Sequence, residues 1–160
     1  MKTFKSVLLA TLVLTSPMVT FANSNTDSDL EMAQTLHQAI LDIDIINLNL
    51  LLAEGNDINS TDDDGNTPLM LASKIGNPRM LKIIMAHEPD VNLKNNEGVT
   101  ALMIAAEYGQ YHVAETLIEA GAQTGIKNNE GYTAAELARK FGHPQILTLL
   151  NNAPALNIAR

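Results

Sequence analysis

A sequence period of 33 residues is the feature that most constrains what this chain can fold into. From residue 65 onward, equivalent residues recur at this spacing in five separate columns. The columns are Gly65/Gly98/Gly131, Thr67/Thr100/Thr133, Ala72/Ala105/Ala138, Gly76/Gly109/Gly142 and Ile84/Leu117/Leu150. Periods of about 20–50 residues are typical of solenoids, in which each repeat buries its apolar face only against its neighbours. The sequence therefore predicts a stack of similar units.

Each period contains the signals of a turn followed by two short helices. Gly65 lies in a run of turn-forming residues, where a positive φ is readily adopted. Thr67 is placed to cap the following helix, and Pro68 fits the first helical turn, where no amide donor is needed. Gly76 is expected to end this helix in a left-handed conformation. The first helix of each unit is thus predicted from local chemistry.

A second helix is predicted from about residue 78 to 86. Its buried row is expected to be Leu81, Ile84 and Met85. The chain then reaches Glu88-Pro89. A residue that precedes proline favours extended dihedral angles, so we expect an irregular turn with Glu88 extended.

The pattern resembles the ankyrin repeat, whose signature is D-x-x-G-x-T-P-L-H-x-A. The chain carries D-D-D-G-N-T-P-L-M-L-A at 62–72, N-N-E-G-V-T-A-L-M-I-A at 95–105 and N-N-E-G-Y-T-A-A-E-L-A at 128–138. Stepping back 33 residues places Leu36, Ala39, Leu48 and Ile58 in the same register, so residues 29–61 are a degenerate first repeat. The resemblance implies an all-α ankyrin-repeat solenoid of about four helix-turn-helix repeats with short hairpin loops. The domain would span 30–160, with repeats at about 29–61, 62–94, 95–127 and 128–160.

Several positions depart from the family pattern. Met32 and Ile43 replace glycines in the first copy, and Pro154 replaces the closing glycine of the fourth. Terminal repeats have a single neighbour, so atypical ends are expected. The histidine of the signature is replaced by Met70, Met103 and Glu136 in the three clear copies. This removes a polar network typical of the family but leaves the predicted fold intact.

The N-terminus reads as a secretory signal. Lys2 and Lys5 precede an apolar run from Val7 to Leu14, and small residues at Thr20 and Ala22 suit cleavage after residue 22. An uncleaved anchor is the alternative, although the apolar run is short for a membrane span. Residues 23–29 read as a flexible leader. We expect the periplasm of a Gram-negative bacterium, with secretion beyond it as a further option.

The charge and composition limit the classes of partner. Removal of residues 1–22 leaves 8 Lys+Arg against 18 Asp+Glu, a net charge of −10. Such a surface repels nucleic acids and anionic membranes and favours a basic protein surface. The chain has no cysteine, which excludes disulfides, thiolate metal sites and a lipid-modified cysteine anchor. No nucleophile motif surrounds Ser60 or Ser73, and no phosphate-binding glycine loop is present. We therefore expect no catalysis and no cofactor.

Metal binding is the less favoured interpretation of the polar clusters. If Asp62 and Asp64 were the third and fifth ligands of a calcium loop, Leu71 would occupy the twelfth position, which needs a bidentate acid. A turn is the better interpretation. The four histidines (His37, His87, His112 and His143) occupy different repeat positions. We interpret them as surface or helix-capping residues rather than as metal ligands.

The resemblance also implies where a partner would bind. In ankyrin stacks the hairpin tips and the exposed side of the first helix form a concave recognition face. The corresponding residues are Asp63, Asp64, Asn66, Lys74, Ile75, Glu97, Val99, Glu107, Tyr108, Tyr132, Lys140 and Phe141. Ile75, Tyr108 and Phe141 are predicted to form an exposed apolar ridge across repeats, with the acidic tips steering a basic partner. Local packing of these rings against neighbouring repeats is the alternative.

The sequence thus favours a non-catalytic protein–protein interaction module in the periplasm. Exported ankyrin proteins suggest a helped or protected enzyme, or a toxin neutralised by an immunity or inhibitor protein, as the partner. A secreted effector that acts in a host cell would share the fold. Self-association through the ridge is a further alternative.

Overall fold

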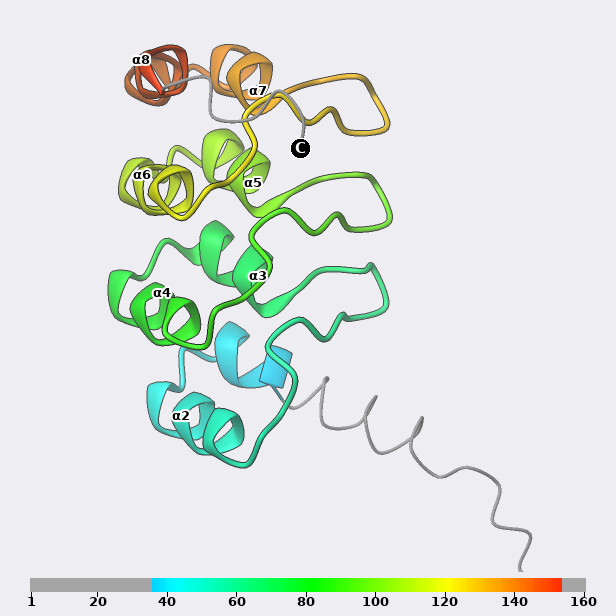
Figure 1. Ribbon diagram of the computed structural model, residues 1–160, viewed down its shortest axis with the longest axis vertical. Coiled ribbons are helices and arrows are strands. Elements are labelled where there is room, and N and C mark those ends of the chain that lie inside the picture. Colours follow the sequence, from blue (N-terminus) through cyan, green and yellow to red (C-terminus); the bar gives the residue numbers. More distant parts are fainter. Residues whose placement is uncertain (1–35, 154–160) are drawn as a thin grey trace, which may run out of the picture.

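The computed structural model describes residues 36–153 and shows a stack of helical repeats (Figure 1). Residues 36–41 are helical, and seven further helices follow. They are α2 (Ile45–Ala53), α3 (Pro68–Ile75), α4 (Pro78–Met85), α5 (Ala101–Glu107), α6 (Tyr111–Glu119), α7 (Ala134–Lys140) and α8 (Pro144–Asn152). No strand is present between residues 36 and 153, which confirms the all-α solenoid. The predicted signal (1–22), the leader (23–29), Met32 and Pro154 lie outside the described residues.

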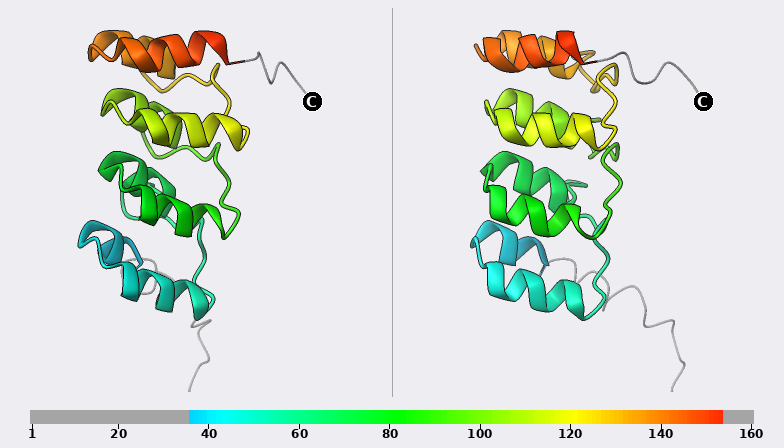
Figure 2. Two further views of the ribbon diagram at one scale, coloured as in Figure 1. Left: turned by 90° about the vertical axis from the view of Figure 1, so that its left-hand side faces the viewer. Right: turned by 60° about the vertical axis from the view of Figure 1, so that its left-hand side comes forward.

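The helices form two layers. Helices α3, α5 and α7 stack on one another in one layer, and a long loop projects from each of these repeats to the same side (Figure 1). Helices α2, α4, α6 and α8 form the second layer, on the side away from the loops (Figure 2). Equivalent residues of successive repeats therefore lie in rows along the stack.

The first helix of each clear repeat begins at the predicted threonine. The Thr67 hydroxyl accepts the Met70 N–H at 3.3 Å, and Pro68 occupies the first turn. Met70, which replaces the signature histidine, accepts the Thr67 N–H through its sulfur at 3.4 Å. In the last repeat the Glu136 carboxylate accepts both the Thr133 N–H, at 2.6 Å, and the Thr133 hydroxyl. These two bonds hold the pKa of Glu136 below its ordinary value.

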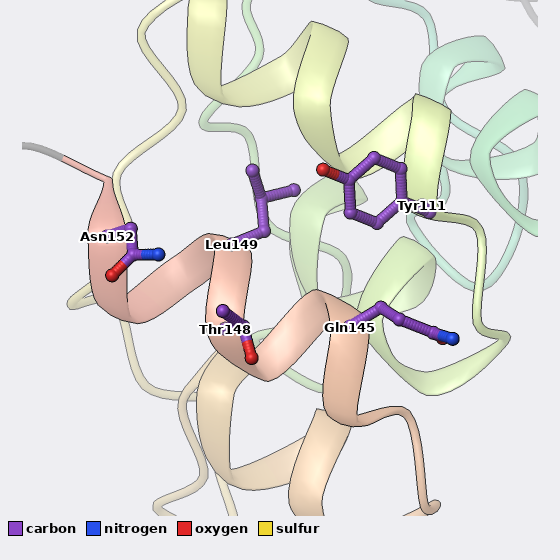
Figure 3. Close-up of a pocket in the computed structure, with 5 residues that line it drawn as sticks. All are labelled: Tyr111, Gln145, Thr148, Leu149 and Asn152. Atoms are coloured by element: carbon purple, nitrogen blue, oxygen red, sulfur yellow. The ribbon is translucent and has the colours of Figure 1, made fainter.

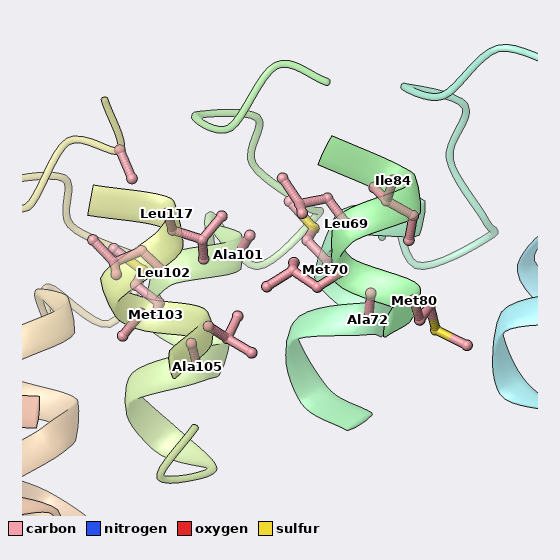
Figure 4. Packing of buried hydrophobic residues seen from close by; sticks show 14 of the residues in the cluster. Leu69, Met70, Ala72, Met80, Ile84, Ala101, Leu102, Met103, Ala105 and Leu117 are labelled. Atoms are coloured by element: carbon pink, nitrogen blue, oxygen red, sulfur yellow. The ribbon is translucent and has the colours of Figure 1, made fainter. Parts of the chain in front are cut away.

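The core is continuous along the stack because small residues let the first helices approach closely. The alanine column is fully buried, and large side chains from both layers pack around it (Figure 4). In α4 the buried residues are Met80, Leu81 and Ile84, whereas Met85 is only half-buried. The predicted row is thus wrong at Met85, because α4 turns Met80 rather than Met85 fully toward the core.

The burial of residues 36–58 follows the register expected for a degenerate first repeat. Leu36, Ala39 and Leu48 are fully buried at the predicted register. The interpretation of His37 as a surface or capping residue was wrong. His37 is only 4% exposed, and its Nε2 lies 2.7 Å from the Asn66 carbonyl oxygen. His37 occupies the signature histidine position, so its ring points at the loop of the next repeat.

Two residues other than glycine adopt a left-handed backbone. Ile43 has a φ of 56° and Glu88 a φ of 51°. The expectation that Glu88 would be extended before Pro89 was therefore wrong. Glu88 lies 33 residues from both Gly55 and Gly121, which have φ values of 89°. The turn that starts each return loop requires this conformation, and it prevails over the local preference imposed by proline.

Candidate functional site

The projecting loops form a rigid ladder. In each loop an aspartate or asparagine side chain folds back on its own backbone: Asp62 Oδ1 accepts the N–H groups of Asp64, at 3.0 Å, and Asn66, at 2.7 Å. Adjacent loops are joined by backbone bonds, from Asn96 N–H to the Asp64 carbonyl at 3.1 Å and from Asn129 N–H to the Glu97 carbonyl at 2.9 Å. The Asp62 carboxylate is thus used within the turn, which supports the turn interpretation over a calcium loop.

The acidic tips point outward from this ladder. The side chains of Asp63, Asp64 and Glu97 are exposed, as predicted. Asn66 differs, because its amide group donates to Asp62 Oδ2 at 3.1 Å and accepts from the Asn95 amide at 2.9 Å. Its polar atoms therefore hold the loops together, and little of the side chain is left for a partner.

A hollow lies between the loops and the first-layer helices of the second and third repeats. It has a volume of about 220 Å³. Six of the predicted binding residues line it: Asn66, Lys74, Glu97, Val99, Glu107 and Tyr108. We call the surface made by the loop tips and the exposed sides of α3, α5 and α7 the inner face. Sequence reasoning placed these residues on one surface, and the structure brings them around one concavity.

Lysines and aromatic rings alternate along the inner face. Lys74 Nζ lies 5.3 Å from the centre of the Tyr108 ring. Lys140 Nζ lies 4.6 Å from the Tyr132 ring and 5.6 Å from the Phe141 ring. Each exposed contact of this kind contributes only about 0.5–1 kcal/mol, so its main effect here is to hold the rings in place. Tyr108 and Phe141 remain 46% and 45% exposed.

The predicted apolar ridge is shorter than expected. Tyr108 and Phe141 follow the last residues of α5 and α7, and both rings are exposed. Ile75 is the last residue of α3 and is half-buried, because its side chain packs against the core. The expectation of an exposed Ile75 was therefore wrong. The exposed ridge consists of the two aromatic residues and their lysines.

Side chains from the following repeat hold the ends of the first-layer helices. The Gln110 amide donates to the Lys74 carbonyl at 3.3 Å, and His143 Nε2 donates to the Glu107 carbonyl at 2.9 Å. His143 is thus a capping residue, as interpreted, but it caps a helix of the preceding repeat. The first bond holds the backbone of Lys74, and the second holds the residue before Tyr108.

The outer layer has grooves that the sequence did not predict. One lies between α6 and α8, with a volume of about 550 Å³, and is lined by Tyr111, Gln145, Thr148, Leu149 and Asn152 (Figure 3). The Tyr111 ring faces the α8 side chains across the groove. A second groove, between α4 and α6, also includes Tyr111. In the sequence, the only signal for these grooves was Tyr111, at the start of the second helix of its repeat. This position lies outside the binding face that we expected.

Metal-ligating side chains do not gather near these surfaces in residues 36–153. In the described part of the chain, no group of three His, Cys, Asp or Glu side chains is placed to hold a metal ion. No helix among residues 36–153 is long and apolar enough to cross a bilayer. The inner face offers groups suited to contacts with another molecule. These are aromatic rings with lysines beside them, and acidic side chains at the loop tips, all held on a fixed backbone.

Comparison with known families agrees with this geometry. The sequence model described as ankyrin repeats (3 copies) matches residues 36–128, which is more than half of the chain. The match begins within the degenerate first repeat and includes the loops and helices that form the hollow. No curated protein matches the chain.

Proposed function

Since this chain belongs to the ankyrin-repeat family, we propose that it is a non-catalytic protein-binding module that holds a partner on its inner face. Ankyrin repeats are in general protein–protein interaction modules. The observation that carries the proposal is the pair of exposed rings, Tyr108 and Phe141, each beside a lysine, with Tyr108 also lining the hollow. Aromatic residues on a preformed surface are typical of interface hot spots.

The rigidity of the surface supports recognition without rearrangement. Backbone bonds join neighbouring loops, and side-chain bonds from Gln110 and His143 fix the helix ends. A preformed surface loses little conformational freedom on binding, so more of the contact energy appears as affinity. The exposed acids at the tips would speed the approach of a basic partner.

The periplasm is the proposed location, on the strength of the signal-like residues 1–22. The partner we favour there is an enzyme or a toxin that presents a basic surface. An inhibitor or immunity role is consistent with the acidic tips.

The test compares the proteins captured from a periplasmic extract by three immobilised chains. These are the wild type, a Tyr108→Ala/Phe141→Ala variant and a Tyr111→Ala control. Tyr111 is also an exposed tyrosine but lies on the outer layer, so the control removes a similar ring from the other side. We expect the double variant alone to lose the captured partner.

Two results would contradict the proposal. Equal capture by the wild type and the double variant would show that the rings do not bind. Loss of capture together with a large fall in melting temperature would show that the rings stabilise the fold instead.

Recovery of the protein mainly from culture supernatant would contradict the periplasmic location and would favour an effector.

A further inference from the structure

The first repeat exposes aliphatic side chains in a way that the other repeats do not. Ile46 is 85% exposed, Leu50 is 56% exposed and Ile43 is 49% exposed. We call Ile46 and Leu50 the end patch. Leu41, also exposed, lies beside them in sequence, whereas the large apolar residues exposed in later repeats are aromatic. In the described residues, nothing covers these side chains.

The repeat register shows which way the end patch faces. Ile46 and Leu50 correspond to His112 and Thr116 of the third repeat, which line the groove against α4 of the preceding repeat. They correspond also to Gln145 and Leu149 of the fourth repeat, which line the groove against α6. In both cases these positions face the second helix of the repeat before. In the first repeat they face the end of the described stack, where α2 is the outermost helix (Figure 1).

The charge of the first repeat indicates which kind of molecule would bind the end patch. The helices of the first repeat and their connection, residues 36–54, contain three acidic residues, Asp42, Asp44 and Glu54, and no lysine or arginine. A second copy of this end would bring two negative surfaces together. The preceding residues 23–35 contain three acidic residues and no basic residue, so they are also negatively charged and would be repelled by this end. A cationic partner fits the patch best.

We propose that the end patch binds a cationic amphipathic α-helix of a partner protein. Helix α4 shows one chemistry that covers the corresponding face of the third repeat. Helix α4, which lines the groove opposite His112 and Thr116, contributes Leu81 and Met85, four residues apart, with Lys82 beside them. A partner helix with apolar residues at i and i+4 and flanking lysines or arginines would place similar groups against Ile46 and Leu50. This site is separate from the inner face.

The proposal is tested with a labelled helical peptide that carries leucines at i and i+4, flanking lysines and alanine elsewhere. A second peptide replaces each lysine with glutamate, and a third scrambles the cationic sequence. The chain from residue 23 onward is titrated, and binding is measured by fluorescence anisotropy at several salt concentrations. We expect the cationic peptide alone to bind, more weakly as salt rises. We expect an Ile46→Ser/Leu50→Ser variant to bind at least about tenfold more weakly, because both exposed side chains would be buried in the complex.

The controls separate this proposal from the inner-face function. The Tyr108→Ala/Phe141→Ala variant should bind the peptide as the wild type does, even if it loses the captured partner. Circular dichroism should show that the serine variant is folded, since both changed side chains are exposed.

The proposal fails if the scrambled peptide binds equally well or if the serine variant binds with unchanged affinity. It also fails if sedimentation shows a wild-type dimer that the serine variant abolishes, since the occupant is then a second copy. Binding by the chain from residue 23 but not by the full chain would identify the chain's own N-terminal segment as the occupant, and would equally overturn it.

Discussion

Replacement of Gly109 by alanine tests how the repeats are held together at the inner face. Gly109 follows α5 and has a φ of 73°. A β-carbon placed there would lie 2.7 Å from Cε1 of the His143 ring, well inside contact distance. The same ring donates to the Glu107 carbonyl at 2.9 Å. Gly109→Ala should therefore strain the backbone and also push His143 away from its hydrogen bond.

The expected cost has two separable parts. A left-handed conformation costs a residue with a β-carbon roughly 1–2 kcal/mol, offset by about 0.4–1 kcal/mol from the stiffer unfolded chain. Displacement of the His143 ring and loss of its bond add about 1–2 kcal/mol. Gly109→Ala should thus lower the free energy of unfolding by about 1.5–3 kcal/mol, the sum of a net backbone part of about 0.5–1 kcal/mol and the His143 part.

Gly142→Ala is the matched control. Gly142 occupies the same column, has a φ of 79° and has open space where its β-carbon would lie. Gly142→Ala should lower the free energy of unfolding only by the backbone part, about 0.5–1 kcal/mol. In a His143→Ala background, Gly109→Ala should cost no more than this control.

Urea unfolding followed by circular dichroism gives the four free energies of the cycle formed by Gly109→Ala and His143→Ala, provided that the slopes agree. We expect a coupling energy of about 1–2 kcal/mol between the two changes. If Gly109→Ala and Gly142→Ala lowered the free energy of unfolding equally, with no coupling, the β-carbon at position 109 would not displace His143.

Four further substitutions test other parts of the structure. Ile43→Asn should raise the melting temperature, because asparagine tolerates the left-handed backbone better than isoleucine, and the exposed side chain loses little burial; a lower melting temperature would contradict the strain. Tyr108→Ala and Phe141→Ala should each leave the melting temperature within a few degrees, roughly, of the wild type, since both rings are exposed; thermal denaturation would show a larger fall if they were core residues. Glu136→Gln should remove a pH-dependent part of stability. The folded-state pKa of Glu136 is lowered, so its contribution is present above the ordinary glutamate pKa and is lost as pH falls through the lowered value. The stability difference between wild type and Glu136→Gln should therefore shrink on acidification, and a difference that grows would contradict the capping bonds.

The sequence was sufficient for features that depend on neighbouring residues or on the repeat register. The Thr67 cap, the Pro68 start and the fully buried alanine column followed from local chemistry and spacing. The register also located the first repeat, although both of its signature glycines were replaced. Most predicted binding residues lie on one face for the same reason, since a fixed period places equivalent residues in rows.

Features that depend on distant contacts were missed or misjudged. The bond from His143 to Glu107 joins residues 36 apart, and a lone histidine gives no sign of it. His37 is buried because the loop of the next repeat closes over it. For Glu88, the local rule for residues before proline was outweighed by the geometry of the return loop. The exposure of Ile46 required knowledge of which helix face meets the preceding repeat.

The central claim, that the inner face is where the partner binds, is tested most directly by hydrogen exchange of the chain alone and in complex with the captured partner. The account predicts slower exchange on binding in the loop tips around 62–67, 95–100 and 128–133 and at the ends of α3, α5 and α7. Exchange in α4, α6 and α8 should be unchanged. Protection confined to those outer helices, with the loop tips unaffected, would contradict the account.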